Sequence, residues 1–192
     1  MRFLMISLIV PLIVSCSISI KQQSFEDKVL AFMLSKDHKQ GTFTVVKPNA
    51  TFSMLGQSEE LLISMCGLVS KEINNNELDT CSLINRLVQK NKYKPPLSIE
   101  SNRSAGYIID KSGQFSNYFS EEGGGWDRWY KENPDAKCYT TVSLPVVDEK
   151  TDFVAIYIGT QCNWRVGVGY LVILTNTDGK FVEKHRVRLW VS

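Results

Sequence analysis

Apolar residues recur at helical spacing through the first half of the chain, after residue 23. Three segments carry this pattern, and their apolar positions are Phe25, Val29, Phe32 and Met33, then Leu61, Met65, Leu68 and Val69, then Leu83, Ile84, Leu87 and Val88. Ser24 and Ser58 stand where they can cap the first two helices. Lys94-Pro95-Pro96 ends the pattern, which therefore predicts a helical part over about residues 24–94.

The stretch between the first two helical segments is ambiguous. Phe43 and Val45 alternate with threonines, as the residues of a strand do, but Pro48 and Asn49 interrupt the alternation. The pattern therefore does not decide between strand and loop from Gly41 to Leu55.

The second half of the chain carries the pattern of a sheet. Four strand-like runs cover about residues 139–147, 153–158, 170–174 and 181–191. The middle two runs are continuously apolar, which is typical of strands that are covered on both faces. Asp178-Gly179 predicts a tight hairpin before the last run.

These patterns together predict an α+β fold. We expect a helical N-terminal half packed on one face of a C-terminal antiparallel β-meander of about four strands, the mainly β part covering about residues 104–192. One helix is inserted ahead of the meander, because Trp126, Trp129 and Tyr130 lie at i, i+3 and i+4. We treat residues 24–192 as a single domain.

The chain begins with the pattern of a secretory signal. Arg2 is the only charged residue among the first twenty, and residues 3–14 are mostly apolar. Ile13-Val14-Ser15-Cys16 resembles the lipobox of bacterial lipoproteins, which implies cleavage before Cys16 and attachment of acyl chains to it. Residues 1–15 are then a signal peptide, and residues 16–23 are a lipidated tether.

Two alternatives to this interpretation remain, an ordinary signal peptide that contains a cysteine or an uncleaved membrane helix. The apolar run could extend to Ile20, but Ser15, Ser17 and Ser19 interrupt it near the length that a membrane span needs. In the lipoprotein resemblance, Ser17 rather than Asp after the cysteine favours the outer membrane. The expected location is the bacterial envelope, with the domain facing the periplasm.

Composition and charge narrow the possible partners. Hydrophobic residues make up 43% of the chain and charged residues 22%, as in ordinary globular proteins. Removal of residues 1–15 leaves 177 of the 192 residues, with 21 basic side chains (22 less Arg2) and 20 acidic ones. No basic stripe with interleaved aromatic residues is present, so nucleic acid is not the expected partner.

The cysteines suggest two disulfides. With Cys16 assigned to lipid, four cysteines remain, an even number that fits an oxidising compartment. If the second and third helices fold back near Asn74, position 66 lies opposite about position 82, and if the strands fold back at Glu149-Lys150, position 138 lies opposite about position 161. These registers predict the pairs Cys66–Cys81 and Cys138–Cys162, and four reduced cysteines are the alternative.

Several short motifs in the C-terminal third recur in a group of bacterial proteins. They are Gly125-Trp126, Trp129-Tyr130, Asn133-Pro134, Ala155-Ile156-Tyr157, Gln161-Cys162, Gly167-Val168-Gly169-Tyr170, Asp178-Gly179-Lys180 and Leu189-Trp190-Val191-Ser192. On these motifs, residues 126–192 resemble an uncharacterised group of bacterial secreted proteins and lipoproteins, and the resemblance implies no activity. In that group, the cysteine that corresponds to Cys162 is commonly followed by a glycine-rich stretch that contains a second cysteine. Asn163-Trp164-Arg165 stands there instead, which favours the pairing of Cys162 with Cys138.

Metal, cofactor and nucleophile chemistry have little support. His38 and His185 are the only histidines, and neither lies in a ligand-spaced cluster, so no metal or cofactor is expected. His185 shares the parity of the apolar positions in its run, which predicts a partly buried histidine. No Gly-x-Ser-x-Gly motif selects a nucleophilic serine. Gly123-Gly124-Gly125 lacks the Lys-Ser or Lys-Thr that follows a phosphate loop.

A pair of carboxylates is the strongest enzymatic hypothesis. Glu121 and Glu122 precede the triglycine, and Asp127 follows it on the predicted helix. Acidic and aromatic side chains together suit a sugar, so Glu121, Glu122, Trp126 and Trp164 are candidate ligand-binding residues. The alternative is an acidic loop that complements the helix dipole, with the aromatic residues as the buried face of the helix.

The expected function is binding rather than catalysis. We expect a non-catalytic lipoprotein that is anchored to the membrane through lipid on Cys16 and binds a protein or an envelope component. A small-ligand or glycan-binding domain is the second possibility. A carboxylate-dependent hydrolase that uses the Glu121, Glu122 and Asp127 region is the third.

Overall fold

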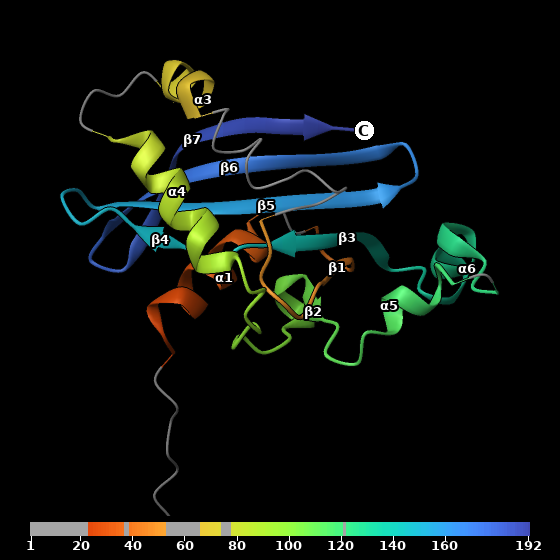
Figure 1. Cartoon of the computed structure of the whole chain (residues 1–192). Coiled ribbons are helices and arrows are strands. Elements are labelled where there is room, and N and C mark those ends of the chain that lie inside the picture. Colours follow the sequence, from red (N-terminus) through yellow and green to blue (C-terminus); the bar gives the residue numbers. More distant parts are fainter. Residues whose placement is uncertain (1–22, 37–38, 53–65, 74–77, 121) are drawn as a thin grey trace, which may run out of the picture.

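The computed structural model describes residues 23–36, 39–52, 66–73, 78–120 and 122–192. The strands are β1 (Phe43–Val46), β2 (Tyr107–Ile109), β3 (Ala136–Val142), β4 (Val146–Val147), β5 (Phe153–Asn163), β6 (Val166–Thr177) and β7 (Lys180–Val191). The helices are α1 (Phe25–Ser35), α3 (Cys66–Ile73), α4 (Thr80–Asn91), the 3-10 turn η1 (Arg103–Ala105), α5 (Gln114–Asn117) and α6 (Gly125–Glu132). Figure 1 shows their arrangement.

All seven strands belong to one mixed sheet. Its order is β2-β1-β3-β5-β6-β7, and β4 pairs with β5. β1 is parallel to β2 and β3, whereas the pairs from β3 to β7 are antiparallel. The β6–β7 hairpin turns at Asp178 and Gly179, both with positive φ, as the sequence predicts. The neighbouring antiparallel strands β3, β5, β6 and β7 form the meander of about four strands that the sequence predicts.

The predicted fold class is wrong for the N-terminal half. We expected a helical part over about residues 24–94, with residues 41–55 undecided between strand and loop, packed on an antiparallel sheet. Instead, β1 lies within this half and joins the sheet. β1 also brings in β2 as a parallel neighbour, with Thr44 opposite Tyr107. The result is a seven-stranded mixed sheet with short helices.

The physical reason for this error is the length and pairing of β1. Phe43 and Val45 alternate with threonines, but the strand has only four residues and Pro48 and Asn49 interrupt the pattern soon after it. Its partners, β2 and β3, lie far away in sequence, so no local turn announces the pairing. Part of the second predicted helix, with Ser58, Leu61 and Met65, lies outside the described residues.

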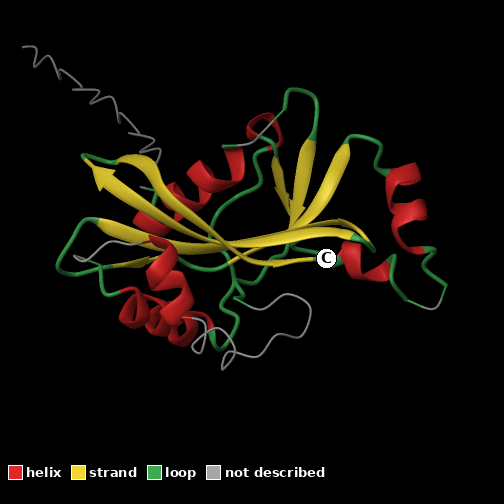
Figure 2. Ribbon diagram, turned by 90° about the horizontal axis from the view of Figure 1, so that it is seen from above, coloured by secondary structure: helices red, strands yellow, loops and turns green. Residues whose placement is uncertain are grey.

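Helices cover both faces of the sheet (Figure 2), where the sequence led us to expect them on one. α1 packs on the face that carries Val154, Ile156 and Val172. α3 and α4 pack on the opposite face, against Tyr157 and Ile173. Because successive side chains of a strand point to opposite faces, the continuously apolar runs of β5 and β6 bury both sets.

A third core of aromatic side chains lies at the β1–β3 end of the sheet. Trp126 and Trp129 of α6 and Phe115 of α5 pack with Phe43 and Tyr139. Phe115 stacks on Tyr139 with ring centroids 3.8 Å apart, and both tryptophans meet Phe115 edge-on. The register of β3 with β5 places Tyr139 on the same face as Tyr157, so α5 and α6 extend the cover that α3 and α4 begin.

Two disulfides join the cysteine pairs that the hairpin registers predict. Cys66, the first residue of α3, is bonded to Cys81 in the first turn of α4. Cys138 on β3 is bonded to Cys162 on β5. The closed loops have sequence separations of 15 and 24, and each bridge can stabilise the fold by about 3 kcal/mol by restricting the unfolded chain.

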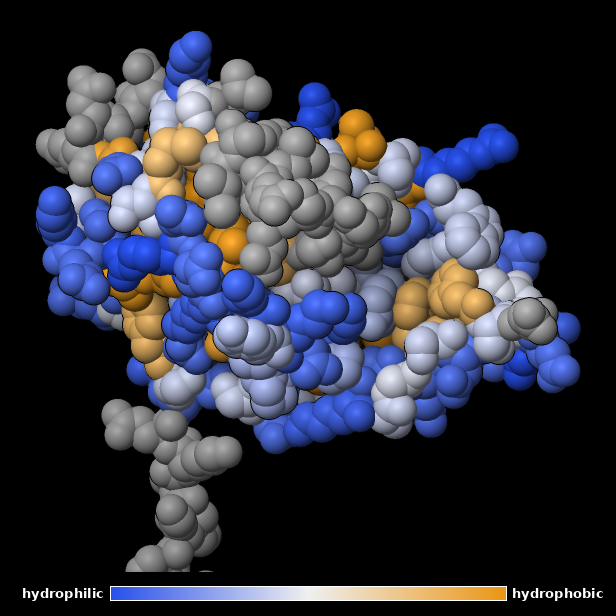
Figure 3. All heavy atoms as spheres, in the orientation of Figure 1, coloured by the Kyte–Doolittle hydropathy of each residue, from blue (hydrophilic) through white to orange (hydrophobic). Residues whose placement is uncertain are grey.

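The surface is largely polar in the view of Figure 3, with apolar side chains in smaller areas between hydrophilic ones. Within the described residues, no helix has the length and apolar character that crossing a membrane requires. Cys16 and the proposed signal segment lie outside the described residues.

Candidate functional site

α1 is too short to cover its face of the sheet. Its 11 residues span about 16 Å, whereas the 12 residues of β6 span about 40 Å. Val172 and Leu174 of β6 are fully buried, but Val168 and Tyr170 on the same face are only half-buried. A cleft of about 390 Å³ lies over this uncovered part of the sheet.

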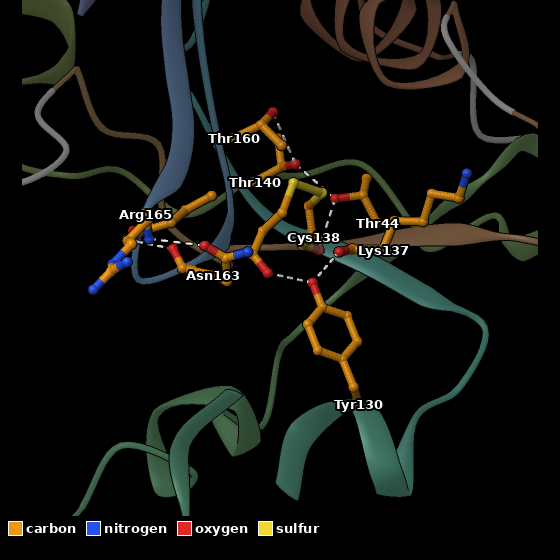
Figure 4. Close-up of a disulfide and its surroundings, with 10 residues drawn as sticks. Thr44, Tyr130, Lys137, Cys138, Thr140, Thr160, Asn163 and Arg165 are labelled. Atoms are coloured by element: carbon orange, nitrogen blue, oxygen red, sulfur yellow. Dashed lines mark hydrogen bonds between the residues drawn. A yellow bond between two sulfur atoms is a disulfide. The ribbon is translucent and has the colours of Figure 1, made fainter. Parts of the chain in front are cut away.

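Three threonines on neighbouring strands line the cleft with hydroxyl groups. They are Thr44 on β1, Thr140 on β3 and Thr160 on β5, and they form a row (Figure 4). The Thr44 hydroxyl donates to the Cys138 carbonyl oxygen at 3.0 Å and lies 2.6 Å from the Thr140 hydroxyl. The Thr140 and Thr160 oxygens are 3.4 Å apart. Thr140 is buried at 2% exposure, whereas Thr44 and Thr160 are half-buried. Each hydroxyl has two acceptor lone pairs, so Thr44 and Thr160 keep hydrogen-bonding capacity for a ligand.

An irregularity in β3 turns two consecutive residues toward the cleft. Phe43 is paired with Ala136, and Val45 with Tyr139, so β3 has one more residue than β1 over this interval. Such a bulge re-aims side chains. Lys137 and Cys138 consequently both line the cleft, although neighbours in a regular strand point to opposite faces.

Basic side chains surround the cleft. Lys39, Lys137 and Arg186 line it, and its described lining contains no carboxylate. Arg186 donates to both carboxylate oxygens of Glu183 at 2.9 and 2.8 Å, and Lys36 binds Glu183 at 2.5 Å. Hydrogen bonding from Arg186 and then from Lys36 lowers the pKa of Glu183 to about 2, despite partial burial. These five side chains, four cations and one anion, carry a net charge of +3.

Apolar side chains complete the lining. Met33 and Leu34 come from the last turn of α1, and Ile158 comes from β5. The guanidinium of Arg186 lies over the Tyr170 ring, 5.1 Å from its centroid. A ligand in the cleft would meet hydroxyl groups, an aromatic ring and positive charge, a combination that suits an anion that also carries hydroxyl groups.

The disulfide Cys138–Cys162 joins β3 to β5 beside the cleft, and α6 contacts the same two strands from the other face. Tyr130 of α6 points its hydroxyl toward this bridge, within hydrogen-bonding distance of the Lys137 and Cys162 carbonyl oxygens (Figure 4). Burial raises the pKa of Tyr130, so the hydroxyl stays protonated and can donate. The cleft residues of β3 are thus fixed from both faces of the sheet.

The ligand-binding residues expected from the sequence do not come together in a cleft. Trp126 is buried with 4% exposure in the aromatic core, whereas Trp164 is 69% exposed. Glu122 and Asp127 are exposed, and Glu121 lies outside the described residues. None of the cavities described for this chain is lined by Trp126, Trp164 or these acidic side chains.

The glycines of the triglycine have a conformational role. Gly124 and Gly125 have φ of 73° and 61°, a region that other residues rarely adopt. A Cβ on Gly123 would lie 2.3 Å from the Tyr118 carbonyl oxygen. The Gly125 N–H donates to the same oxygen at 2.6 Å, so these glycines let the chain turn tightly into α6.

Of the two histidines, His185 is not part of the described lining of the cleft. His185 is half-buried on β7, and His38 lies outside the described residues. The described residues contain no group of three or more His, Cys, Asp or Glu side chains that could hold a metal ion.

No sequence pattern predicted the cleft itself. Its polar residues come from distant segments, with Thr44 on β1, Lys137 on β3 and Arg186 on β7. No motif unites them, because the parallel pairing of β1 and the bulge in β3 bring them together.

Comparisons of the chain with family models, with curated proteins and with solved structures found no match. The resemblance of residues 126–192 to secreted bacterial proteins and lipoproteins therefore stays a prediction.

Proposed function

We propose that the protein is a non-catalytic lipoprotein of the bacterial envelope that binds an anionic envelope component in the cleft beside α1. Lipid on Cys16 would hold it at the outer membrane, with the folded domain in the periplasm. The observation that carries the binding proposal is the combination of a row of threonine hydroxyls and a net charge of +3 around one cleft.

The anchor is supported by the sequence and by the disulfides. A charged start, an apolar segment and the lipobox-like Ile13-Val14-Ser15-Cys16 stand at the N-terminus. The bridges Cys66–Cys81 and Cys138–Cys162 fit an oxidising compartment outside the cytoplasm.

The binding role is supported by the construction of the cleft. Its polar groups stand on three adjacent strands and are braced by the Cys138–Cys162 bridge and by Tyr130. A pre-formed site of this kind loses little conformational entropy on binding. Lys39 and Lys137 can supply charge-assisted hydrogen bonds, which are the stronger class of hydrogen bond.

Titration calorimetry with a charged and a neutral sugar tests the cleft. N-acetylglucosamine 1-phosphate should bind at least tenfold more tightly than N-acetylglucosamine, because a hydrogen bond to a charged group contributes about 1.5–3 kcal/mol. Lys39→Gln with Lys137→Gln should weaken binding of the phosphate at least tenfold. Lys131→Gln with Arg165→Gln, which removes two exposed charges outside the cleft lining, should leave it unchanged. Equal loss in both double variants would contradict the proposed site.

Cell fractionation tests the anchor separately. Cys16→Ala should move the protein out of the membrane fraction, because a chain without acyl groups has no buried hydrocarbon to hold it. Mass spectrometry of the N-terminal peptide should find acyl groups on Cys16 in the wild-type protein only. A membrane fraction unchanged by the substitution would refute the anchor.

A further inference from the structure

An exposed turn follows α4, and none of its residues lines the cleft. The turn consists of Lys92, Tyr93 and Lys94, all three exposed to solvent. Tyr93 is 87% exposed, the highest value among the large apolar and aromatic residues that the structure describes. Burial within the fold therefore does not explain the aromatic ring at this position.

The turn is held firmly at both ends. Asn91, only 3% exposed, donates to the Leu87 and Leu144 carbonyl oxygens at 2.8 and 3.1 Å and accepts from the Leu144 N–H at 2.7 Å. Asn49 donates to the Lys94 carbonyl oxygen at 3.0 Å. Lys94 has φ of 49°, in the left-handed region that residues other than glycine seldom occupy. The fold thus presents Tyr93 outward in a fixed position.

The surroundings of the turn are positively charged. Burial and the nearby charge of Lys94 both lower the pKa of Lys47, which places a third lysine close to the turn. Glu26, on the neighbouring first turn of α1, forms an ion pair with Lys90 at 2.5 Å. The turn therefore offers an aromatic ring between positive charges.

The turn lies next to the point where the proposed tether joins the domain. The ion pair between Glu26 and Lys90 places the first turn of α1 beside the last turn of α4, and both lie on the lower side of Figure 1. Hydrophilic residues line this edge in Figure 3. Eight residues lead from Cys16 to Ser24, which limits their separation to about 29 Å.

We propose that the Lys92–Tyr93–Lys94 turn rests on the surface of the membrane that holds the lipid anchor, with the lysines at anionic headgroups and the ring between them. Lysine attracts anionic lipid surfaces, and the tyrosine ring has an apolar body and a polar tip that suit the headgroup level. This inference rests on the proposed anchor at Cys16.

The contact would orient the binding site. The cleft begins at Met33 and Leu34, at the end of α1 that lies farther from the tether. A domain that rests on the membrane near the start of α1 would therefore hold the cleft open toward the periplasm.

Lysine labelling of the lipidated protein in vesicles tests the contact. The protein is reconstituted in phosphatidylcholine vesicles with or without phosphatidylglycerol, and acetylation rates are measured by mass spectrometry at low and high salt. With phosphatidylglycerol at low salt, Lys92 and Lys94 should react at least fivefold more slowly than without it, and high salt should remove the difference. Lys131 on α6 should react at one rate throughout. If the acetylation rates of Lys92 and Lys94 do not change between these conditions, the proposal is wrong.

Matched variants separate this contact from general electrostatic attraction. Nitration of Tyr93 should be slowed by phosphatidylglycerol in the wild type and in Lys131→Glu with Arg165→Glu, but not in Lys92→Glu with Lys94→Glu. Loss of protection in both double variants, or in neither, would overturn the proposal. Failure of the anchor itself would show as an N-terminal peptide without acyl groups, which is a different result from unprotected labelling of an acylated protein.

Discussion

The two faces of the sheet are built from the same strands but are covered to different extents. On the face that carries Tyr157, α3 and α4 cover one end and the aromatic core of α5 and α6 covers the other. On the opposite face α1 covers one end, and the cleft lies over the rest. One face is therefore closed along the strands, and the other is left open where the threonines and basic residues stand.

The difference is visible in alternate residues of a single strand. In β5, Ile156 and Tyr157 point to opposite faces, and both are buried. Farther along, Thr160 lines the open cleft, whereas Gly159 on the closed face lets the Tyr157 hydroxyl approach, because a Cβ there would lie 2.4 Å from it. The closed face is thus specialised for packing and the open face for polar contacts. Substitutions on the two faces should accordingly separate stability from binding.

The largest contrast should come from two tryptophans. Trp126→Ala should lower the free energy of unfolding by about 3–5 kcal/mol, because it removes a buried ring from the aromatic core. Trp164→Ala should cost about 1 kcal/mol or less, since the ring is 69% exposed and contacts mainly Phe119 and Gly125. Denaturant unfolding followed by circular dichroism measures both. Similar losses in the two variants would show that the buried ring of Trp126 stabilises the aromatic core no more than the exposed ring of Trp164 does.

Two tyrosines on opposite faces give a smaller contrast. The Tyr157 hydroxyl accepts a hydrogen bond from Trp190 Nε1 at 3.0 Å in the closed core. Tyr157→Phe should therefore cost about 1–3 kcal/mol, because it leaves a buried N–H without its acceptor. Tyr170→Phe on the open face should change the free energy of unfolding by less than about 0.5 kcal/mol. Denaturant unfolding measures both changes. A larger loss of stability for Tyr170→Phe than for Tyr157→Phe would contradict the assignment of the closed face as the more tightly packed one.

The parts of the fold that sequence patterns predicted depend on local turns. Asp178-Gly179 forms the turn of the β6–β7 hairpin, so the antiparallel pairing of the two strands could be predicted from it. The pairing of Cys138 with Cys162 follows in the same way, because β3 and β5 are antiparallel and close in sequence. In such hairpins the turn determines the register.

The parts that were missed depend on contacts between remote segments. β1 was ambiguous because its partners lie beyond α3 and α4 in the chain. The placement of Lys137 and Cys138 on one face requires the bulge in β3, which no residue type announces. The burial of Trp126, by contrast, agrees with the alternative in which the aromatic residues form the buried face of the helix. The candidate site therefore emerged only from the arrangement of the sheet.

The smallest expected effect concerns the ion pairs at the rim of the open face. The pKa of Glu183 is lowered to about 2 by Arg186 and Lys36, below the ordinary glutamate value. Its charge therefore contributes stability above about pH 5, and this contribution is lost as the pH falls toward 2. Glu183→Gln should lower the free energy of unfolding by about 1 kcal/mol at pH 7, because partly exposed ion pairs contribute little more.

Unfolding curves at pH 7 and pH 2 measure how much the charge of Glu183 contributes to stability. The difference between the wild type and Glu183→Gln should shrink at pH 2, where about half of the wild-type carboxyl groups are protonated in the folded state. Glu100→Gln is the matched control, since the Glu100 side chain is 78% exposed beside Lys111 and should contribute less than about 0.5 kcal/mol at either pH. A pH-independent difference for Glu183→Gln would mean that packing of the side chain, rather than its charge, stabilises the open face. The cleft would then owe its shape to contacts that survive neutralisation.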